Sequence, residues 1–442
     1  MDHNPASGRQ ALELVGQYPQ PNGAKLAVAG VAAEQILDSR GWPTVQVTLE
    51  LADDTQVSAA TPAGASIGAY EAAEVRDGGH SYDGRSVHTA VAAIAAEVAP
   101  MLTSTAWGSI TEVDDALREL DGTPNLSRLG ANAVAAVSMA AARGMAHTTG
   151  FPLYRWISAV TGATALLPVP HFNLLGGGAH AANELDFQEF MIAPVGAANT
   201  RHAIQAGSEI YHLLRQKINA TYHTAGLGDE GGFAPPLSRT VEALDLLLEA
   251  ILDAGYTTDQ VKIAIDCAAN GFYLGDGRYR LDGRDLTRLQ LADYYVSLLK
   301  DYPLWSIEDP FAEGDHPGWG TFFDRVSDTV QIVGDDLYVT DARRIREGAE
   351  NSYSNGALIK PNQIGTVSQA FDAIAAAREN HMEIMVSQRS GETSDDFIAD
   401  LAVGAGTGQI KAGAPARGER VAKYNRLMHI ENQEPELRYG LT

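Results

Sequence analysis

KIAID (262–266), WSIEDP (305–310) and QIVGDD (331–336) are three short apolar runs that each end in acidic residues. Each run is short enough to be a buried parallel strand. An unpaired buried charge is very costly, so a carboxylate at the end of such a strand needs a partner. A divalent cation held by Asp266, Glu308 and Asp335 would be such a partner.

Three further runs continue the pattern downstream: ALIK (357–360), EIMVSQRS (383–390) and GQIK (408–411). Strand-like runs alternate here with amphipathic helical patterns, such as 241–253 and 367–379, and this alternation predicts a parallel sheet covered by helices. We predict a TIM-type α/β barrel, because in such a barrel the strand ends converge on one face, where the site lies. An open doubly wound sheet is disfavoured, because no Gly-x-Gly-x-x-Gly fingerprint opens a helix.

The sequence predicts three regions. Residues 1–26 are polar and form an N-terminal extension, with a short helix predicted near 10–15. Residues 27–165 form a smaller α+β domain. Within it, apolar and polar residues alternate over 45–51, as expected for a half-exposed strand, and 56–59 is predicted to pair with it antiparallel. An Ala-rich stretch with helical periodicity follows at 86–150. Residues 166–442 form the barrel, with the boundary near 161–163.

Composition excludes several classes of function. The chain has 442 residues, 45% of them hydrophobic, and a net charge of -24, which argues against nucleic acid and anionic membranes as partners. The single cysteine, Cys267, excludes an intramolecular disulfide and a multi-cysteine zinc site. No signal-peptide pattern opens the sequence, and no apolar stretch is long enough to span a bilayer. We therefore expect a soluble, cytoplasmic protein.

The residues at the strand ends predict a metal site with a nearby base. Carboxylates from three strands suit magnesium, although any one of them alone is more simply a helix cap or part of an ion pair. Lys360 and Lys411 end later strands, or are ordinary surface lysines. Two ammonium groups and a dication in one pocket would depress a lysine pKa. A lysine that is neutral near neutral pH can act as a general base.

Three loops carry weaker signals. The acidic loop GDEGG (228–232) places a carboxylic acid over a substrate, or is a plain turn. RSG (389–391) offers donors to a phosphate, or contains a surface arginine. PAGASIGA (62–69) can approach a ligand closely, or is an ordinary connection.

Together these segments closely resemble enolases. The matching motifs run along nearly the whole chain: ILDSRG (36–41), GAS (64–66), QEFMI (188–192), GDEGG (228–232), DCAA (266–269), SIEDPF (306–311), NQIG (362–365), RSGET (389–393) and GQIK (408–411). The resemblance implies an N-terminal α+β domain on a C-terminal α/β barrel, as a homodimer or higher homo-oligomer. It also implies a small anionic phosphorylated substrate.

The resemblance assigns roles to individual residues. It implies two magnesium ions, the first held by the three strand-end carboxylates and the second held in part by Ser66. A lysine or histidine base with magnesium is a known arrangement in this superfamily. The resemblance implies that Lys360 is the base that removes the C2 proton of 2-phosphoglycerate, and that Glu230, with Glu189, is the acid that assists departure of the 3-hydroxyl. Lys411 would pair with the substrate carboxylate, and Arg389 and Ser390 would bind its phosphate. His180 would be a lid-loop histidine close to the substrate.

The chain departs from the family pattern at several positions. Glycolytic enolases carry histidine where this chain has Gln388, another substrate-contacting candidate, and glutamine cannot carry a charge. The chain also differs from the usual enolase motifs at Trp42, Ile67, Gly176 and the pair 270–271. These changes predict a specialised homologue such as carboxyphosphonoenolpyruvate synthase, with a CMP-activated phosphonoformate as donor. The alternatives are a glycolytic enolase and a non-catalytic structural or binding role.

Overall fold

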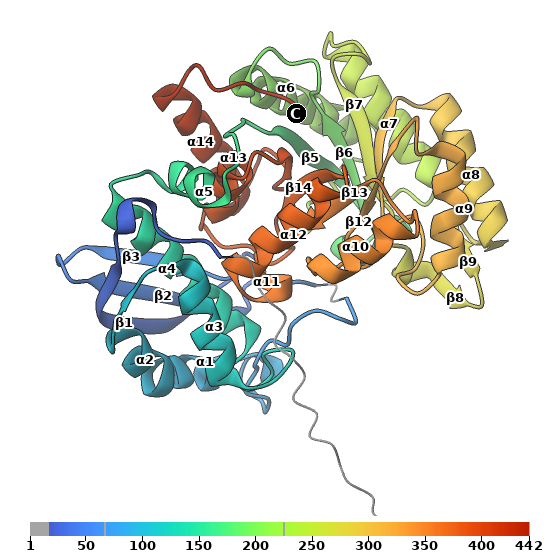
Figure 1. Cartoon of the computed structure of the whole chain (residues 1–442). Helices are drawn as coiled ribbons and strands as arrows, with labels where there is room; N and C mark the ends of the chain where they lie inside the picture. The colour runs from blue at the N-terminus through green and yellow to red at the C-terminus, as the bar shows by residue number, and fades with distance from the viewer. Residues whose placement is uncertain (1–16, 66–67, 224–225, 442) are drawn as a thin grey trace, which may run out of the picture.

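The computed structural model describes residues 17–65, 68–223 and 226–441. It contains a smaller N-terminal unit built on a four-stranded sheet and a larger unit built on a closed barrel (Figure 1). The helix predicted near 10–15 and the predicted magnesium ligand Ser66 lie outside the described residues.

The N-terminal sheet has the strand order β3-β2-β1-β4. Its bounds are β1 Leu26–Leu37, β2 Pro43–Leu51, β3 Gln56–Ala60 and β4 Ala106–Trp107. The predicted antiparallel pair is present as β2 and β3, and the alternation in the sequence matches the alternating burial of β2. The long strand β1 was not predicted, because its run of Ala, Val and Gly shows no regular apolar–polar alternation.

The stretch predicted to be helical, 86–150, does form helices, and a further helix follows it. The helices are α1 His88–Ala93, α2 Ala99–Thr103, α3 Ile110–Asp121, α4 Ala131–Thr149 and α5 Leu153–Thr161. Most of α4 is buried, and its small side chains allow a close approach to the sheet. At Gly144 an added Cβ atom would come within 2.8 Å of the end of the Leu26 side chain, so a larger residue here would force that side chain to move.

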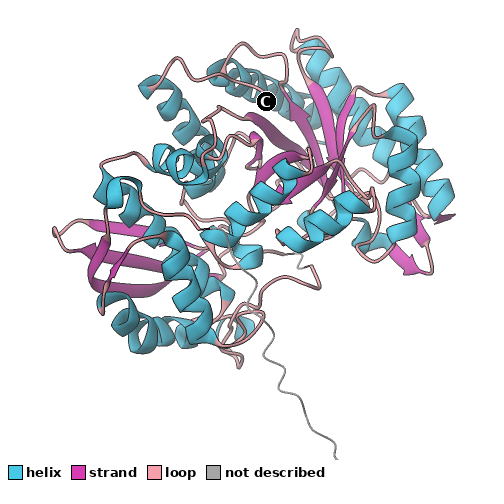
Figure 2. Cartoon of the chain, in the orientation of Figure 1, coloured by secondary structure: helices cyan, strands magenta, loops and turns pink. Residues whose placement is uncertain are grey.

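The barrel is closed, with the strand order β11-β12-β13-β14-β15-β5-β6-β7 (Figure 2). All six strands predicted from the polar-ended runs are present. The barrel bounds are β5 Val169–Gly176, β6 Glu189–Ala193, β7 Lys262–Asp266, β11 Leu304–Glu308, β12 Gln331–Gly334, β13 Gly356–Ile359, β14 Glu383–Ser387 and β15 Gly408–Lys411. The α/β barrel prediction is therefore confirmed.

The prediction of a wholly parallel sheet is wrong for one strand. β6 runs antiparallel to both of its neighbours, β5 and β7. The reason is the short connection 177–188, which contains a single 3₁₀ turn at Gly178–His180 and no crossover helix. A parallel neighbour needs a longer crossover. As a result, Glu189 at the start of β6 lies at the same barrel edge as the ends of the parallel strands, and its Cα pairs with that of Asp266.

Further helices surround the barrel (Figure 1). Their bounds are α6 Thr200–Tyr222, α7 Thr240–Asp253, α8 Arg288–Asp301, α9 His316–Val326, α10 Ala342–Glu350, α11 Pro361–Ile364, α12 Val367–Glu379, α13 Phe397–Gly404 and α14 Gly418–Gln433. A small separate sheet is formed by β8 Tyr273–Gly275, β9 Arg278–Leu281 and β10 Arg284–Thr287. In the described part of the chain, no helix has the length and apolar character needed to cross a bilayer.

A buried carboxylate between the two units gives a pH-dependent stability prediction. Burial raises the pKa of Asp114 on α3 from 3.8 to about 6, although Ser138 Oγ donates to it at 2.6 Å and Ser368 N at 2.8 Å. The folded protein therefore binds more protons than the unfolded chain between these pH values, and stability falls as pH rises through this window. A difference of one between the pKa values in the folded and unfolded states corresponds to about 1.4 kcal/mol of unfolding free energy.

Replacing Asp114 with asparagine removes this penalty while retaining hydrogen-bonding capacity. We expect the variant to gain about 3 kcal/mol relative to the parent between pH 4 and pH 7. Chemical denaturation at several pH values measures the difference. A difference that does not change with pH would contradict the prediction.

Candidate active site

The predicted strand-end residues meet at one edge of the barrel. Asp266 ends β7 and Glu308 ends β11, and their Cα atoms are paired in the parallel ladder. Asp335 follows β12 directly, Lys360 follows β13, and Lys411 ends β15. The five side chains come from five strands and are all buried. The barrel therefore brings together ionisable groups that lie far apart in the sequence.

Lys411 lies at the centre of a carboxylate cluster. Its Nζ is 2.8 and 2.9 Å from the two oxygens of Glu308, 3.0 Å from Glu189 Oε1 and 3.2 Å from Asp266 Oδ2. Burial opposes the charge on this lysine, but the three carboxylates outweigh it and raise the pKa of Lys411 well above its ordinary value. Burial raises the pKa of Asp266 and Glu308, and a bound cation would favour the ionised form of both carboxylates.

Lys360 forms a second ion pair beside this cluster. Its Nζ donates to Asp335 Oδ2 at 2.5 Å, and Gln363 Nε2 donates to Asp335 Oδ1 at 2.9 Å. The sequence predicts a depressed lysine pKa when a dication shares the pocket, whereas direct pairing with Asp335 acts in the opposite direction. Burial is the largest influence and lowers the pKa of Lys360, but the carboxylates around it, Asp335 first among them, together raise it. The expectation counted the nearby positive charges and did not foresee direct pairing with a predicted metal ligand.

The donor set at this edge fits magnesium. Asp266, Glu308 and Asp335 are hard oxygen donors on three hydrogen-bonded neighbouring strands. Within the described residues they do not form one tight group, because Lys411 and Lys360 hold them separately. The groups whose ligand atoms lie within 4.8 Å of one another are His180 with Glu189 and Glu230, and Asp309 with Asp335 and Asp336. Glu189 Oε2 is buried without a hydrogen-bond partner among the described residues, which adds a further unsatisfied oxygen.

Asp309 has a structural role in the second group. Its two carboxylate oxygens accept from the backbone N–H groups of Asp335 and Asp336, each at 2.9 Å. Asp309 itself adopts a left-handed backbone conformation, with φ of 41°. These bonds orient the segment that presents Asp335 to the site.

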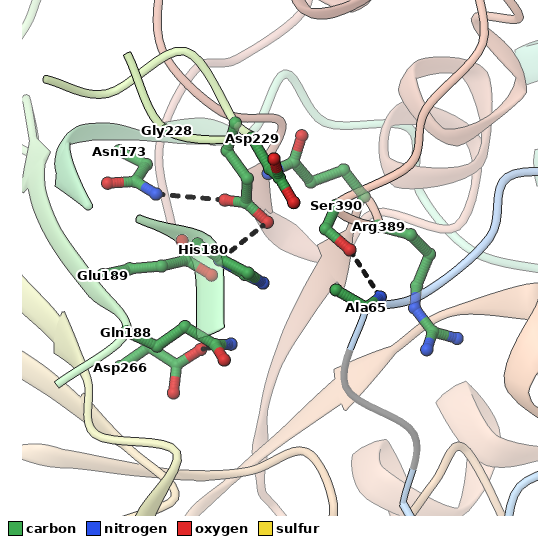
Figure 3. Close-up of polar contacts among 12 residues, drawn as sticks. Ala65, Asn173, His180, Gln188, Glu189, Gly228, Asp229, Asp266, Arg389 and Ser390 are labelled. Atoms are coloured by element: carbon green, nitrogen blue, oxygen red, sulfur yellow. Dashed lines mark hydrogen bonds and ion pairs between the residues drawn. The ribbon is translucent and has the colours of Figure 1, made fainter. Parts of the chain in front are cut away.

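The acidic loop 228–232 lies against His180, where Asp229 N donates to His180 O at 3.0 Å (Figure 3). Glu230 Oε2 accepts from Asn173 Nδ2 at 3.0 Å, and Glu230 Oε1 lies 3.5 Å from His180 Nδ1. Burial lowers the pKa of His180, which favours its neutral form. Burial and the neighbouring charge of Glu230 together raise the pKa of Glu189. Two buried carboxyl groups that share an environment in this way suit a proton donor.

The predicted phosphate partners are engaged by the N-terminal unit. Arg389 Nη1 and Nη2 donate to the two oxygens of Glu71, at 2.9 and 3.2 Å. Ser390 Oγ accepts from Ala65 N at 2.6 Å, a contact drawn in Figure 3. Gly68 N also donates to Glu71 Oε1 at 3.1 Å. The bidentate carboxylate of Glu71 thus lies where a phosphate would meet the arginine fork.

This geometry predicts that Glu71 competes with anions for Arg389. Replacing Glu71 with glutamine removes its charge, so we expect inorganic phosphate to bind about 10-fold more tightly, since a hydrogen bond to a charged group contributes about 1.5–3 kcal/mol. Isothermal titration calorimetry measures the affinity. Glu74→Gln is the matched control, because Glu74 pairs with Arg76. Unchanged or weaker phosphate binding in Glu71→Gln would contradict competition.

The structure shows the surroundings of four of the positions that depart from the family pattern, whereas Ile67 lies outside the described residues. Trp42 stacks under Arg85, at 4.4 Å from the ring centroid, and Asn270 Nδ2 donates to Asp336 Oδ2 at 2.9 Å on the exposed rim. A Cβ added to Gly271 would meet nothing within 4 Å. Gln388 differs, because it is buried directly beside Arg389. Of these four positions, Gln388 bears most directly on the chemistry.

Several contributing residues were not found from the sequence. Glu71, Asn173, Gln363 and Arg420 hold the predicted residues in place, yet none of them ends a polar-tipped strand in the sequence. Asn173 lies inside β5, a strand that was not predicted, and Arg420 lies on α14 near the end of the chain. Gln363 lies in the matching motif NQIG (362–365), but no local signal connects Glu71, Asn173 or Arg420 to the site.

Known proteins resemble the chain over most of its length. A family model described as the enolase N-terminal domain matches residues 28–157, and one described as the enolase C-terminal TIM barrel domain matches residues 164–438. An enolase of Acidothermus cellulolyticus is 50% identical over 408 residues, which is 92% of this chain and 94% of the relative. An enolase of Sulfurimonas denitrificans is 46% identical over 410 residues, covering 92% and 96%.

Proposed function

Because this chain belongs to the enolase family and is a lyase, we propose that it removes water from 2-phosphoglycerate to form phosphoenolpyruvate, with magnesium as cofactor. The observation that carries the proposal is the buried edge where Lys360, Lys411 and Glu230 surround carboxylates from neighbouring strands. The relatives' names favour this reaction over carboxyphosphonoenolpyruvate synthesis, which no comparison supports.

The proposed first step is removal of the C2 proton by Lys360. The C2 proton of a carboxylate anion is very weakly acidic, because its removal adds negative charge to the carboxylate. Mg²⁺ held by Asp266, Glu308 and Asp335 would supply positive charge that stabilises this anion, and Asp335 would then be shared between the metal and Lys360. Lys411 pairs with the substrate carboxylate, and Arg389 and Ser390 hold the phosphate.

The second step is loss of the 3-hydroxyl. The electron pair left at C2 forms the C2–C3 double bond as the C3–O bond breaks, and a proton from Glu230 converts the departing hydroxide to water. Glu189 supports this role, because its raised pKa keeps a proton available in the carboxyl pair. His180, lying 3.5 Å from Glu230, orients the pair.

Other features are proposed from the family resemblance. We propose that residues 27–165 and 166–442 act as capping and catalytic domains, that Ser66 contributes to a second magnesium site, and that the protein works as a cytoplasmic homodimer. A non-catalytic role is disfavoured, because the buried ionisable groups at the barrel edge are costly to maintain without a ligand.

A coupled assay tests the proposed reaction. Phosphoenolpyruvate formed from 2-phosphoglycerate is consumed by added pyruvate kinase and lactate dehydrogenase, and NADH oxidation is followed. We expect rapid turnover with Mg²⁺. Because pyruvate kinase itself needs Mg²⁺, the effect of EDTA is measured directly by the ultraviolet absorbance of phosphoenolpyruvate, and we expect no turnover after chelation. Lack of turnover with Mg²⁺ by folded protein would overturn the proposal and reopen the specialised synthase alternative.

A further inference from the structure

The acidic loop 228–232 is held by its backbone. Four successive carbonyl oxygens, those of residues 228–231, each accept a hydrogen bond from a donor outside the loop. In the order of the carbonyls, the donors are Arg417 Nη1 at 3.2 Å, Arg420 Nη2 at 3.1 Å, Ala414 N at 3.0 Å and Tyr211 OH at 3.0 Å. The backbone that carries Glu230 is therefore fixed on all four sides, and three of the four donors come from residues 414–420.

Arg417 also connects this loop to the N-terminal unit. Its Nη2 donates to Ser39 O at 3.1 Å, in the segment between β1 and β2, and its Nε forms an ion pair with Glu419 Oε1 at 3.1 Å. A Cβ atom built on Gly231 would lie 3.3 Å from Arg417 Cδ, so the aliphatic part of the side chain packs against the loop. One guanidinium group thus bonds to the acidic loop and to the N-terminal unit at the same time.

The backbone of Arg417 is strained. The residue directly precedes α14 and has φ of 70° and ψ of 135°. Residues with a Cβ atom rarely adopt such a positive φ, and strain of this kind persists where the surrounding structure or a function requires the side chain. Glycine would relieve the strain but would lose the hydrogen bonds to Gly228 and Ser39. The contacts of the arginine side chain therefore explain why a strained residue occupies this position.

We propose that Arg417 is a positioning residue for the second step of the reaction, and that it acts through the acidic loop by keeping the Glu230 carboxyl group at the departing 3-hydroxyl. This inference rests on the proposed function and extends it. The proposed base of the first step, Lys360, is held separately by Asp335. Loss of Arg417 should therefore slow loss of the hydroxyl and leave removal of the C2 proton intact.

Replacing Arg417 with methionine tests this division between the two steps. The variant keeps an aliphatic side chain but loses both donors. In D₂O with 2-phosphoglycerate and Mg²⁺, we expect C2 proton exchange at the parent rate, whereas phosphoenolpyruvate forms about 10- to 100-fold more slowly, since a misplacement of about 1 Å can cost about 100-fold. Arg417→Lys keeps one donor and should show an intermediate rate of product formation.

The matched control is Arg378→Met. Arg378 Nη2 also donates to a backbone carbonyl, that of Ala405 after α13, at 2.6 Å. We expect this variant to exchange the C2 proton and to form product at the parent rates.

Two further measurements separate positioning from general damage. Hydrogen exchange followed by mass spectrometry should show faster exchange of the loop in Arg417→Met, at the amides of Gly228 and Asp229 that donate to Gly232 O and His180 O. Arg417→Gly relieves the backbone strain, so we expect a higher melting temperature than for Arg417→Met but equally slow product formation. Slow turnover in the more stable variant would show that the loss is not caused by unfolding.

The outcomes that would overturn the proposal are distinct. Product formation at the parent rate by folded Arg417→Met would overturn it, and so would equal slowing of C2 exchange and product formation. Unchanged amide exchange in the loop would show that Arg417 does not hold it. A parent protein that neither exchanges the C2 proton nor forms product would overturn the proposed function itself, and the role in the second step would fail with it.

Discussion

Replacing Lys360 with methionine is expected to lower kcat for 2-phosphoglycerate by about 10³- to 10⁴-fold, the upper part of the usual contribution of a general base. Methionine fills a similar volume but cannot accept the C2 proton. In the structure the ammonium group of Lys360 contacts Asp335, one of the three proposed magnesium ligands. The substitution therefore removes a competitor for the metal as well as the base. Steady-state kinetics with saturating Mg²⁺ measures the effect.

Magnesium binding serves as the internal control for this variant. A Lys360→Met protein that binds Mg²⁺ at least as tightly as the parent, yet turns over slowly, has lost the base and kept the metal site. A variant that keeps kcat within tenfold of the parent would exclude Lys360 as the base.

Replacing Lys411 with methionine is expected to destabilise the metal-free protein by about 3–5 kcal/mol, the usual cost of removing one partner from a buried ion pair. Lys411 Nζ lies within 3.2 Å of Glu189, Asp266 and Glu308, and its removal leaves those buried carboxylates uncompensated. Mg²⁺ should restore part of the loss, since a ligand at 100 times its Kd contributes about 2.7 kcal/mol. Chemical denaturation with and without Mg²⁺ measures both effects.

The comparison variant is Lys262→Met, at the other end of β7. Lys262 pairs with the exposed Asp259 at 3.4 Å, so its removal should change stability by less than about 1 kcal/mol. A Lys411→Met protein as stable as the parent without metal would show that Lys411 does not neutralise the cluster. A loss of stability that Mg²⁺ does not relieve would show that the remaining carboxylates do not bind the cation.

The sequence could predict the strands whose ends carry the chemistry. A buried parallel strand corresponds to a short apolar run in the sequence. A carboxylate or lysine at the end of such a run indicates a functional site, because burying a charge is costly. That reasoning located Asp266, Glu308, Asp335, Lys360 and Lys411, and the barrel indeed places them at one edge. The fold class followed from the same alternation of strands and helices.

The same reasoning could not locate residues whose position depends on topology. Glu189 begins a strand instead of ending one, and it reaches the site because β6 is antiparallel. Glu189 was identified from the resemblance to enolases, because no pattern of spacing in the sequence indicates it. Glu71 and Arg420 both contact Arg389. Glu71 is more than 300 residues away from it in the sequence and Arg420 is about 30 residues away, so no local pattern encodes these contacts. The pairing of Lys360 with Asp335 likewise depends on side-chain geometry.

Proton exchange at C2 tests the central claim most directly. The protein is incubated in D₂O with 2-phosphoglycerate and Mg²⁺, and the C2 proton and the product are followed by NMR. We predict that the parent protein exchanges the C2 proton and forms phosphoenolpyruvate, that Glu230→Gln exchanges the proton but forms product slowly, and that Lys360→Met does neither. Exchange by Lys360→Met at the parent rate would contradict the account, as would a folded parent protein that neither exchanges the proton nor forms product.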